Sequence, residues 1–236
     1  MVTIFLVRGM LIGVFAGLLS FGFAKVFAEP QIDRAIAFEE QIDKAKGEDP
    51  GPELVSRRMQ STFGLLTAVL VYGMALGGLF GLAFAVAYGR TGSLSPRLIS
   101  LLLAGGGFLA IYLIPALKYP PNPPSVGQPE TIVFRTQTYF LMILISLGIL
   151  ASAVYLRQGI LSRFGNWNAT LIAGASFIAV ATAIILILPD INEVPDGFSA
   201  VLLWRFRLAS IGTQIILWTT LGLCFGALTE RSLKRL

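Results

Sequence analysis

Carboxylates and prolines occur together in three polar segments, and these are the residues whose types and spacing could do chemistry. Hard divalent cations take oxygen ligands, whereas Co(II) or Ni(II) would prefer some imidazole. Carboxylates from three loops that meet at one opening would concentrate cations there. A solvated acidic rim is the alternative interpretation. The candidates for attracting or binding a cation are Glu29, Asp33, Glu130, Asp190, Asn192 and Glu193.

The segment Lys118 to Pro124 reads KYPPNPP, with prolines at four of its seven positions. Proline has no backbone N–H and a fixed φ, so this segment cannot be helical and should run extended and stiff. Such a segment could hold side chains at fixed positions in a binding site, or it could act as a plain lid. Nearby basic residues could snorkel to lipid headgroups. We favour ion pairs to Glu130, Asp190 or Glu193 that lock the loops, formed by Lys118, Arg135, Arg205 and Arg207.

The sequence contains no histidine and a single cysteine, Cys224. This excludes Ser-His-Asp and Cys-His catalysis, HExxH zinc sites and histidine proton relays. No P-loop is present, and no nucleophile stands beside a base. We therefore expect a protein that is not an enzyme, with no permanently bound cofactor.

Composition places the chain in a membrane. Hydrophobic residues make up 55% of the 236 residues and charged residues only 13%, against about 25% charged in an ordinary soluble domain. The mean hydropathy is +0.77. The net charge of +5 is more typical of loops beside anionic lipid than of nucleic-acid binding. We expect one all-α transmembrane domain over residues 1–236.

About six apolar stretches are long enough, or nearly so, to cross a bilayer as helices. The first could be read as a cleavable signal peptide, but its apolar run is long and we expect it to be retained. The predicted spans are 4–28, 63–88, 98–117, 138–156, 169–188 and 206–228, and the long polar loops are 29–62, 118–137 and 189–205.

The first long loop is expected to contain a short amphipathic helix. Pro30 can begin a helix, and apolar residues then recur at helical spacing up to Gly47 and the stop signal Asp49-Pro50-Gly51-Pro52. This helix would lie on the membrane surface or cap the bundle. A second short helix is expected to run from Glu53 into the next span.

The short loops 89–97 and 157–168 carry arginines without any acid. By the distribution of Lys and Arg in short loops, we expect both termini in the cytoplasm and the acidic loops outside. The predicted location is the bacterial cytoplasmic (inner) membrane, with the chain crossing it several times.

Small residues recur every four positions and should let helix backbones approach closely. Packing within one bundle is the favoured interpretation, and an oligomer interface is the alternative. The glycines concerned are Gly9, Gly13, Gly17, Gly73, Gly77, Gly81, Gly222 and Gly226. No Asp or Glu falls in the middle of any predicted span. Membrane-buried ionisable groups usually mark ion pathways, so this argues against a self-contained proton-coupled pump.

The chain resembles the CbtA family of predicted cobalt transporter subunits. The matching stretches are RGMLIGVFAGLLSFGFAKVF and EPQIDRAIAFEE near the start, VYGMALGGLF, KYPPNPPSVGQPETIVFRTQTYF, LPDINEVPDGFSAVLLWRFRLASIGTQ and LWTTLGLCFGAL. They cover most of the chain. The resemblance adds Pro120, Asn122, Pro123 and Trp204 to the candidate loop-organising residues.

The resemblance implies a membrane protein of five or six spans and a small single-span partner, CbtB, that carries histidines. The hypothesis is a permease subunit that takes up divalent cobalt, with Co²⁺ as the transported ion. Without histidine here, a Co(II) site would need carboxylates and carbonyls, or imidazole from the partner. The alternative is a structural or accessory subunit of a larger membrane complex without transport of its own.

Overall fold

The computed structural model describes residues 1–47 and 55–234, and throughout these ranges the regular secondary structure is helical. The residues group into two compact units. Unit 1 comprises Met1–Phe108, Asn122–Val126 and Pro195–Leu236, and unit 2 comprises Leu109–Pro121 and Gly127–Val194. The expectation of one domain over the whole chain stays a prediction.

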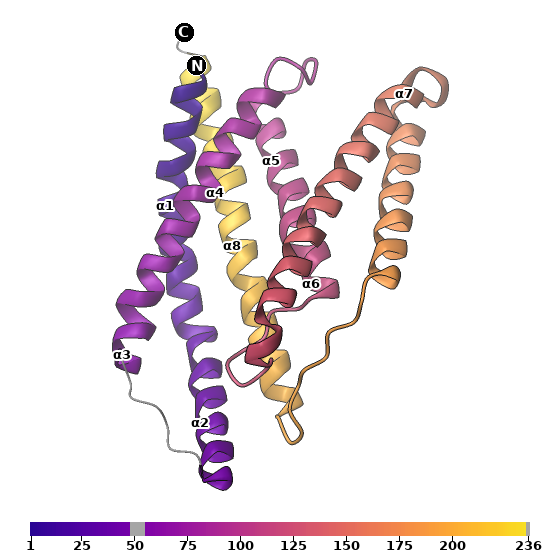
Figure 1. The fold of residues 1–236 in the computed structure, drawn as a ribbon. Helices are drawn as coiled ribbons and strands as arrows, with labels where there is room; N and C mark the ends of the chain where they lie inside the picture. The colour runs from indigo at the N-terminus through magenta and orange to yellow at the C-terminus, as the bar shows by residue number, and fades with distance from the viewer. Residues whose placement is uncertain (48–54, 235–236) are drawn as a thin grey trace. The chain divides into compact units, whose positions relative to one another are not determined.

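The helices of unit 1 are α1 (Val2–Phe27), α2 (Glu29–Lys46), α3 (Arg57–Met59), α4 (Leu65–Ala87), α5 (Pro96–Gly107) and α8 (Ala200–Leu233). A wider π-helical stretch, Gln60–Gly64, joins α3 to α4 without a break. Figure 1 shows α1, α4, α5 and α8 as the long helices of this unit. The start of α1 and the end of α8 lie at the same end of the unit, where Arg8 Nη1 donates a hydrogen bond to Thr229 Oγ1 at 2.9 Å.

Glycines allow α1 and α4 to pack backbone against backbone. A Cβ added at Gly9 would overlap the carbonyl group of Gly77, and one added at Gly13 would overlap that of Gly73. A Cβ at Gly17 would lie 2.9 Å from the carbonyl oxygen of Val69. A Cβ at Gly81 would overlap the carbonyl of Phe5 in the same way. The glycine faces of α1 and α4 therefore meet each other within unit 1.

A second close contact joins α8 to α5. A Cβ at Gly222 would lie 2.7 Å from the Cβ of Ala104, and one at Gly226 would lie 3.0 Å from the Cα of Arg97. The Ser100 hydroxyl uses this proximity to donate a hydrogen bond to the Gly222 carbonyl at 2.8 Å. In a membrane the hydrophobic effect does not drive helices together, so hydrogen bonds of this kind help to hold them in contact.

The predicted amphipathic helix is present as α2, and it ends at Gly47 with a left-handed φ of 72°. Figure 1 shows α2 continuing along the direction of α1. Its apolar side packs inside unit 1, where buried Ala35 belongs to one cluster with Val126, Phe198 and Leu202. This is the arrangement expected of a helix that caps the bundle. The predicted stop at residues 49–52 and the predicted helix start at Glu53 lie outside the described residues.

Unit 2 is built from α6 (Ile114–Lys118), a short 3-10 helix (Pro129–Thr131) and α7 (Ile132–Ile187), together with most of a π-helical stretch, Phe108–Leu113, that continues α5. Gly165 interrupts α7 with φ 74° and ψ 170°. Because glycine has no Cβ, it tolerates this conformation and reverses the chain. Figure 1 shows the two limbs of α7 side by side. The core of the unit forms around buried Met142, Ala181 and Ile114.

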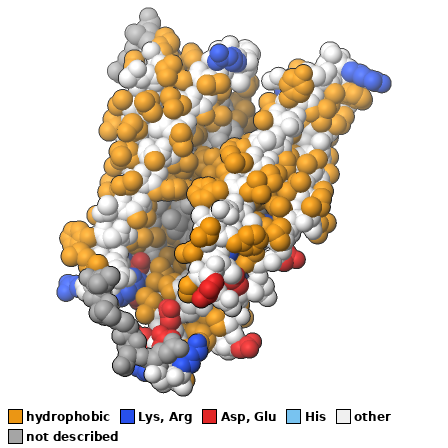
Figure 2. Space-filling model, in the orientation of Figure 1, with side chains coloured by type: hydrophobic (Ala, Val, Ile, Leu, Met, Phe, Trp, Pro, Cys, Tyr) orange, Lys and Arg blue, Asp and Glu red, His pale blue; other side chains and the backbone are white. Residues whose placement is uncertain are grey.

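Within the described residues, five helices are long and apolar enough to cross a membrane, and the fourth of them is the stretch Pro129–Ile187 that folds back at Gly165. Its two limbs correspond to the predicted spans 138–156 and 169–188. Figure 2 shows apolar side chains along the helices and acidic side chains at helix ends. The chain is therefore an all-α polytopic membrane protein.

The helices extend further into the predicted loops than hydropathy indicates. Residues 157–164 continue the first limb of α7, and α8 begins at Ala200 instead of 206. The start at Ala200 follows from capping, because the Ser199 hydroxyl accepts a hydrogen bond from the Leu202 N–H at 3.3 Å. Arg135, Trp204 and Arg205 consequently lie on helices and not in loops.

Candidate functional site

In unit 1, two of the predicted cation-attracting acids lie one helical turn apart at the start of α2 and bind the same arginine. Arg57 donates from Nη2 to Glu29 Oε2 and from Nε to Asp33 Oδ1, the second at 2.9 Å. The side chain of Glu29 is only 7% exposed and that of Arg57 is 26% exposed, whereas that of Asp33 is 58% exposed. The buried carboxylate is thus neutralised by a side chain from the start of the next helix.

Lys25, in the last turn of α1, forms a second link to the same region. Its ammonium donates to the Ser61 carbonyl at 2.8 Å and to the Ser61 hydroxyl at 2.9 Å. Ser61 lies in the π-helical stretch, where the wider turn alters the regular hydrogen bonding of the backbone. Lys25 and Arg57 together fasten the α1–α2 junction to the helix that leads into α4.

Residues 120–123 of the proline-rich segment have no regular secondary structure, as expected for a segment that is not helical. Its first residue, Lys118, is instead the last residue of α6. That the segment runs extended stays a prediction. Its second half belongs to unit 1. Asn122 accepts a hydrogen bond through Oδ1 from Arg207 Nη2 of α8 at 3.0 Å. The Ser125 hydroxyl donates to the Ala35 carbonyl of α2 at 3.0 Å, and Pro123 is fully buried. The segment is therefore clamped between α2 and the start of α8.

In unit 2, the first half of the same segment binds the loop that precedes α8. The Lys118 ammonium, 5% exposed, pairs with the Asp190 carboxylate. Next to it, the Tyr119 hydroxyl donates to the Pro189 carbonyl at 3.1 Å. Pro120 follows, half-buried. Two neighbouring residues at the end of α6 thus hold two neighbouring residues that follow α7.

Glu193 has the most elaborate surroundings of the predicted acids. Its Oε2 accepts from the Gln128 N–H at 2.7 Å and from the Thr131 hydroxyl at 2.9 Å, and it lies 3.4 Å from Arg135 Nε. The Gln128 N–H, then the Thr131 hydroxyl and the Arg135 charge hold the pKa of the Glu193 carboxyl below its ordinary value. The Arg135 guanidinium also fills the space beside Gly127, whose φ is 120°.

The remaining predicted site residues have few contacts. Glu130 and Asn192 are exposed, and within residues 1–47 and 55–234 neither side chain has a hydrogen bond or an ion pair. Trp204 is 61% exposed on α8, and Arg205 beside it is exposed and lacks a partner among the described residues. Their roles as cation-attracting or loop-organising residues stay predictions.

Sequence reasoning did not single out the residues that complete these clusters. These residues are Arg57, Gln128, Thr131 and Ser125. A signal was present for Arg57, because it belongs to the basic pair Arg57-Arg58 just before the second span. The contacts of Gln128 and Thr131 with Glu193 join positions more than 60 residues apart, and no local pattern indicates them.

Three further acids on α2, Glu39, Glu40 and Asp43, also escaped the prediction. They recur at helical spacing, and within the described part of the chain none of them pairs with a basic side chain. Glu39 accepts a hydrogen bond from the Ser125 hydroxyl at 3.3 Å. These acids are therefore free of the ion pairs that occupy Glu29, Asp33, Asp190 and Glu193.

The described residues contain no group of three or more His, Cys, Asp or Glu side chains that could hold a metal ion. Polar side chains inside the helices are used for packing as well. Ser20 donates to the Thr213 carbonyl at 3.3 Å in unit 1, and Ser146 donates to the Ala110 carbonyl in unit 2. Ion pairs therefore hold the loops in place, and a few carboxylates remain exposed to solvent.

Comparison with known proteins gives one family. The family model described as "Probable cobalt transporter subunit (CbtA)" matches residues 2–230. No curated protein and no solved structure matches the chain. Because the family match covers nearly all of the sequence, the chain belongs to the CbtA family.

Proposed function

We propose that this chain is the multi-span subunit of a two-subunit permease for divalent cobalt, acting with a small, histidine-bearing, single-span subunit of the CbtB type. The observation that carries the proposal is the family match over residues 2–230. The helices that could cross a membrane are consistent with it.

The chemistry of the chain supports a division of labour between the two subunits. Co(II) favours some imidazole among its ligands, and the sequence contains no histidine. Four of the predicted cation-attracting acids are occupied by ion pairs. Selective coordination would therefore come from the partner, and this chain would provide the membrane path and a negatively charged entrance.

Within this proposal, the acids have two different roles. The paired acids Glu29, Asp33, Asp190 and Glu193 hold the loops in place. The unpaired acids attract the cation, and among the described residues they include the predicted Glu130 and, on α2, Glu39, Glu40 and Asp43. Free carboxylates raise the local concentration of cations, and salt screens this effect.

The test is uptake of radioactive cobalt in cells that lack other cobalt importers. We expect uptake when this chain and its partner are present together, and background uptake with either chain alone. Uptake by the isolated chain would contradict the assignment of ligands to the partner. No uptake in any combination, with both proteins verified in the membrane, would contradict the permease assignment.

The two roles of the acids are separated by matched variants. We expect Glu130→Gln to raise the cobalt concentration for half-maximal uptake at low ionic strength, with little change at high salt and no change in stability. We expect Glu193→Gln to reduce uptake at both ionic strengths and also to lower the stability of the purified protein at neutral pH, where the wild-type carboxylate is charged. Identical behaviour of the two variants would contradict the distinction.

A structural or accessory role in a larger membrane complex is the second candidate. The pairing of most predicted acids and the use of mid-helix serines in packing favour it. Co-purification with a larger partner at fixed stoichiometry, together with absent cobalt uptake, would support this candidate.

We also propose that the chain lies in the bacterial cytoplasmic membrane with both termini in the cytoplasm. The support is the basic character of the end of unit 1 that holds the start of α1 and the end of α8, which carries Arg8, Arg97 and Arg231. Labelling of single cysteines placed in the 89–95 loop and on α2 by an impermeant reagent tests this. Labelling of the 89–95 loop from outside intact cells would overturn it.

A further inference from the structure

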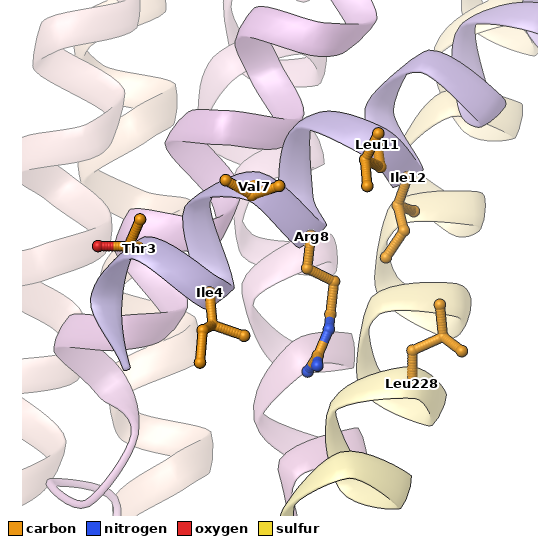
Figure 3. Close-up of a pocket in the computed structure, with 7 residues that line it drawn as sticks. All are labelled: Thr3, Ile4, Val7, Arg8, Leu11, Ile12 and Leu228. Atoms are coloured by element: carbon orange, nitrogen blue, oxygen red, sulfur yellow. The ribbon is translucent and has the colours of Figure 1, made fainter.

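A groove of about 510 Å³ runs along the outer surface of unit 1 near the start of α1. It is lined by Thr3, Ile4, Val7, Arg8, Leu11 and Ile12 of α1 and by Leu228 of α8. Figure 3 shows Arg8 pointing from α1 towards α8, beside Ile4 and Leu228. Its wall is exposed and apolar, with Leu11 67% exposed and Leu228 47% exposed. Both helices are long and apolar enough to cross a membrane, so an exposed apolar wall on them is suited to contact with lipid.

The Arg8 guanidinium lies beside this almost wholly apolar groove, and no carboxylate of the described residues neutralises its charge. The Arg8 guanidinium donates from Nη1 to the neutral hydroxyl of Thr229, which is fully buried. In the described part of the chain no carboxylate pairs with Arg8. The nearest acid along α8, Glu230, is already bound by Arg97 and Lys234. The remaining N–H groups of Arg8 are therefore free for an anion from outside the chain.

Arg8 lies within about the first two turns of α1, near the start of a helix that is long enough to cross a membrane. Arg8 follows the first helical residue, Val2, by six positions, which is about 9 Å along the helix axis. A charged side chain at this depth is costly unless it reaches polar headgroups, and arginine does so by snorkelling. The planar guanidinium also fits the oxygens of a phosphodiester with two parallel hydrogen bonds.

We propose that this groove is a binding site for one anionic phospholipid. Its phosphate pairs with Arg8, and one acyl chain lies along Ile4, Val7, Leu11 and Leu228. Charge complementarity identifies the occupant, because the same end of unit 1 carries Arg97, Arg231 and Lys234 against the single acid Glu230. A free phosphate would use the arginine but leave the apolar wall unused, whereas a phospholipid uses both.

The test measures lipid binding to the purified full-length chain in detergent by native mass spectrometry. We expect phosphatidylglycerol to bind at least about tenfold more tightly than phosphatidylcholine, which corresponds to about 1.4 kcal/mol. Both lipids carry a phosphodiester, but the choline cation of phosphatidylcholine cancels its net charge and is repelled by Arg8. Arg8→Gln, which keeps a donor for Thr229, should abolish most of this preference. The control Arg231→Gln removes a charge at the same end but outside the groove, and it should retain the preference.

Two further experiments distinguish a phospholipid from other possible occupants of the groove. Val7→Trp fills the groove and keeps the charge, so it should also weaken phosphatidylglycerol binding even if Arg8→Gln does not fold. Soluble glycerol phosphate at millimolar concentration should not compete. Equal binding of the two lipids by the wild type, an equal loss in Arg231→Gln, or competition by glycerol phosphate would each overturn the proposal. So would cross-linking of residue 7 to a single-span partner that excludes lipid.

Discussion

The pairing of one arginine with two carboxylates at the start of α2 makes a quantitative prediction. Arg57 binds a nearly buried acid, Glu29, and an exposed one, Asp33, with side-chain exposures of 7% and 58%. An exposed ion pair contributes about 0–1 kcal/mol to the free energy of unfolding, whereas breaking a buried pair by removing one partner costs about 3–5 kcal/mol. The three side chains should therefore differ sharply when each is neutralised.

Arg57→Gln leaves the Glu29 carboxylate without its cation in a poorly hydrated site. Because Arg57 itself is 26% exposed, water can reach part of the vacated space, and we expect a loss of about 2–3 kcal/mol instead of the full buried-pair value. Glu29→Gln should cost about 1–2 kcal/mol, since it loses one charged hydrogen bond but leaves Arg57 paired with Asp33. Asp33→Asn should cost less than about 1 kcal/mol.

The double variant Glu29→Gln/Arg57→Gln completes the cycle. It leaves no unpaired buried charge, so its loss should be at least about 1 kcal/mol smaller than the sum of the two single losses. The free energy of unfolding is measured by denaturant titration of the protein in detergent micelles, with helical circular dichroism as the signal. Additive single losses, or an Asp33→Asn loss as large as that of Arg57→Gln, would refute the assignment of the stabilising energy to the Glu29–Arg57 pair.

Two further predictions concern packing and pH. Gly77→Ala should destabilise the protein by about 1–3 kcal/mol, because the new Cβ overlaps the backbone of α1. In the control Gly22→Ala the new Cβ meets nothing within 4 Å. This variant should be neutral or stabilising by up to about 1 kcal/mol. Both are read by thermal unfolding in detergent, and equal effects would contradict the contact. The pKa of the Glu193 carboxyl is lower in the folded protein than its ordinary value of 4.5. The charged carboxylate therefore stabilises the fold at pH values above 4.5, and this contribution is lost as the pH falls through the lower folded pKa. Glu193→Gln should therefore flatten the loss of stability on acidification below pH 4.5, and Glu130→Gln, as the matched control, should not.

Local patterns were sufficient to predict the helices. Apolar runs of membrane-spanning length predicted the passes, and Pro30 with Gly47 predicted the bounds of α2 nearly to the residue. The absence of helix over residues 120–123 follows from the same kind of local rule, since closely spaced prolines remove several backbone donors and break a helix. Hydropathy missed the helix ends, because capped polar turns such as the one at Ser199 stay helical outside the apolar run.

The sequence alone thus determined that the chain is a helical membrane protein with no histidine chemistry, and its motifs indicated the family. Only the tertiary structure decided how its charges are used, because ion pairs such as Arg57 with Glu29 and Lys118 with Asp190 join positions 28 and 72 residues apart. The composition of a loop cannot say whether a carboxylate faces water or an arginine. That choice depends on which helix ends meet, and in unit 1 glycine contacts bring α1 against α4 and α5 against α8.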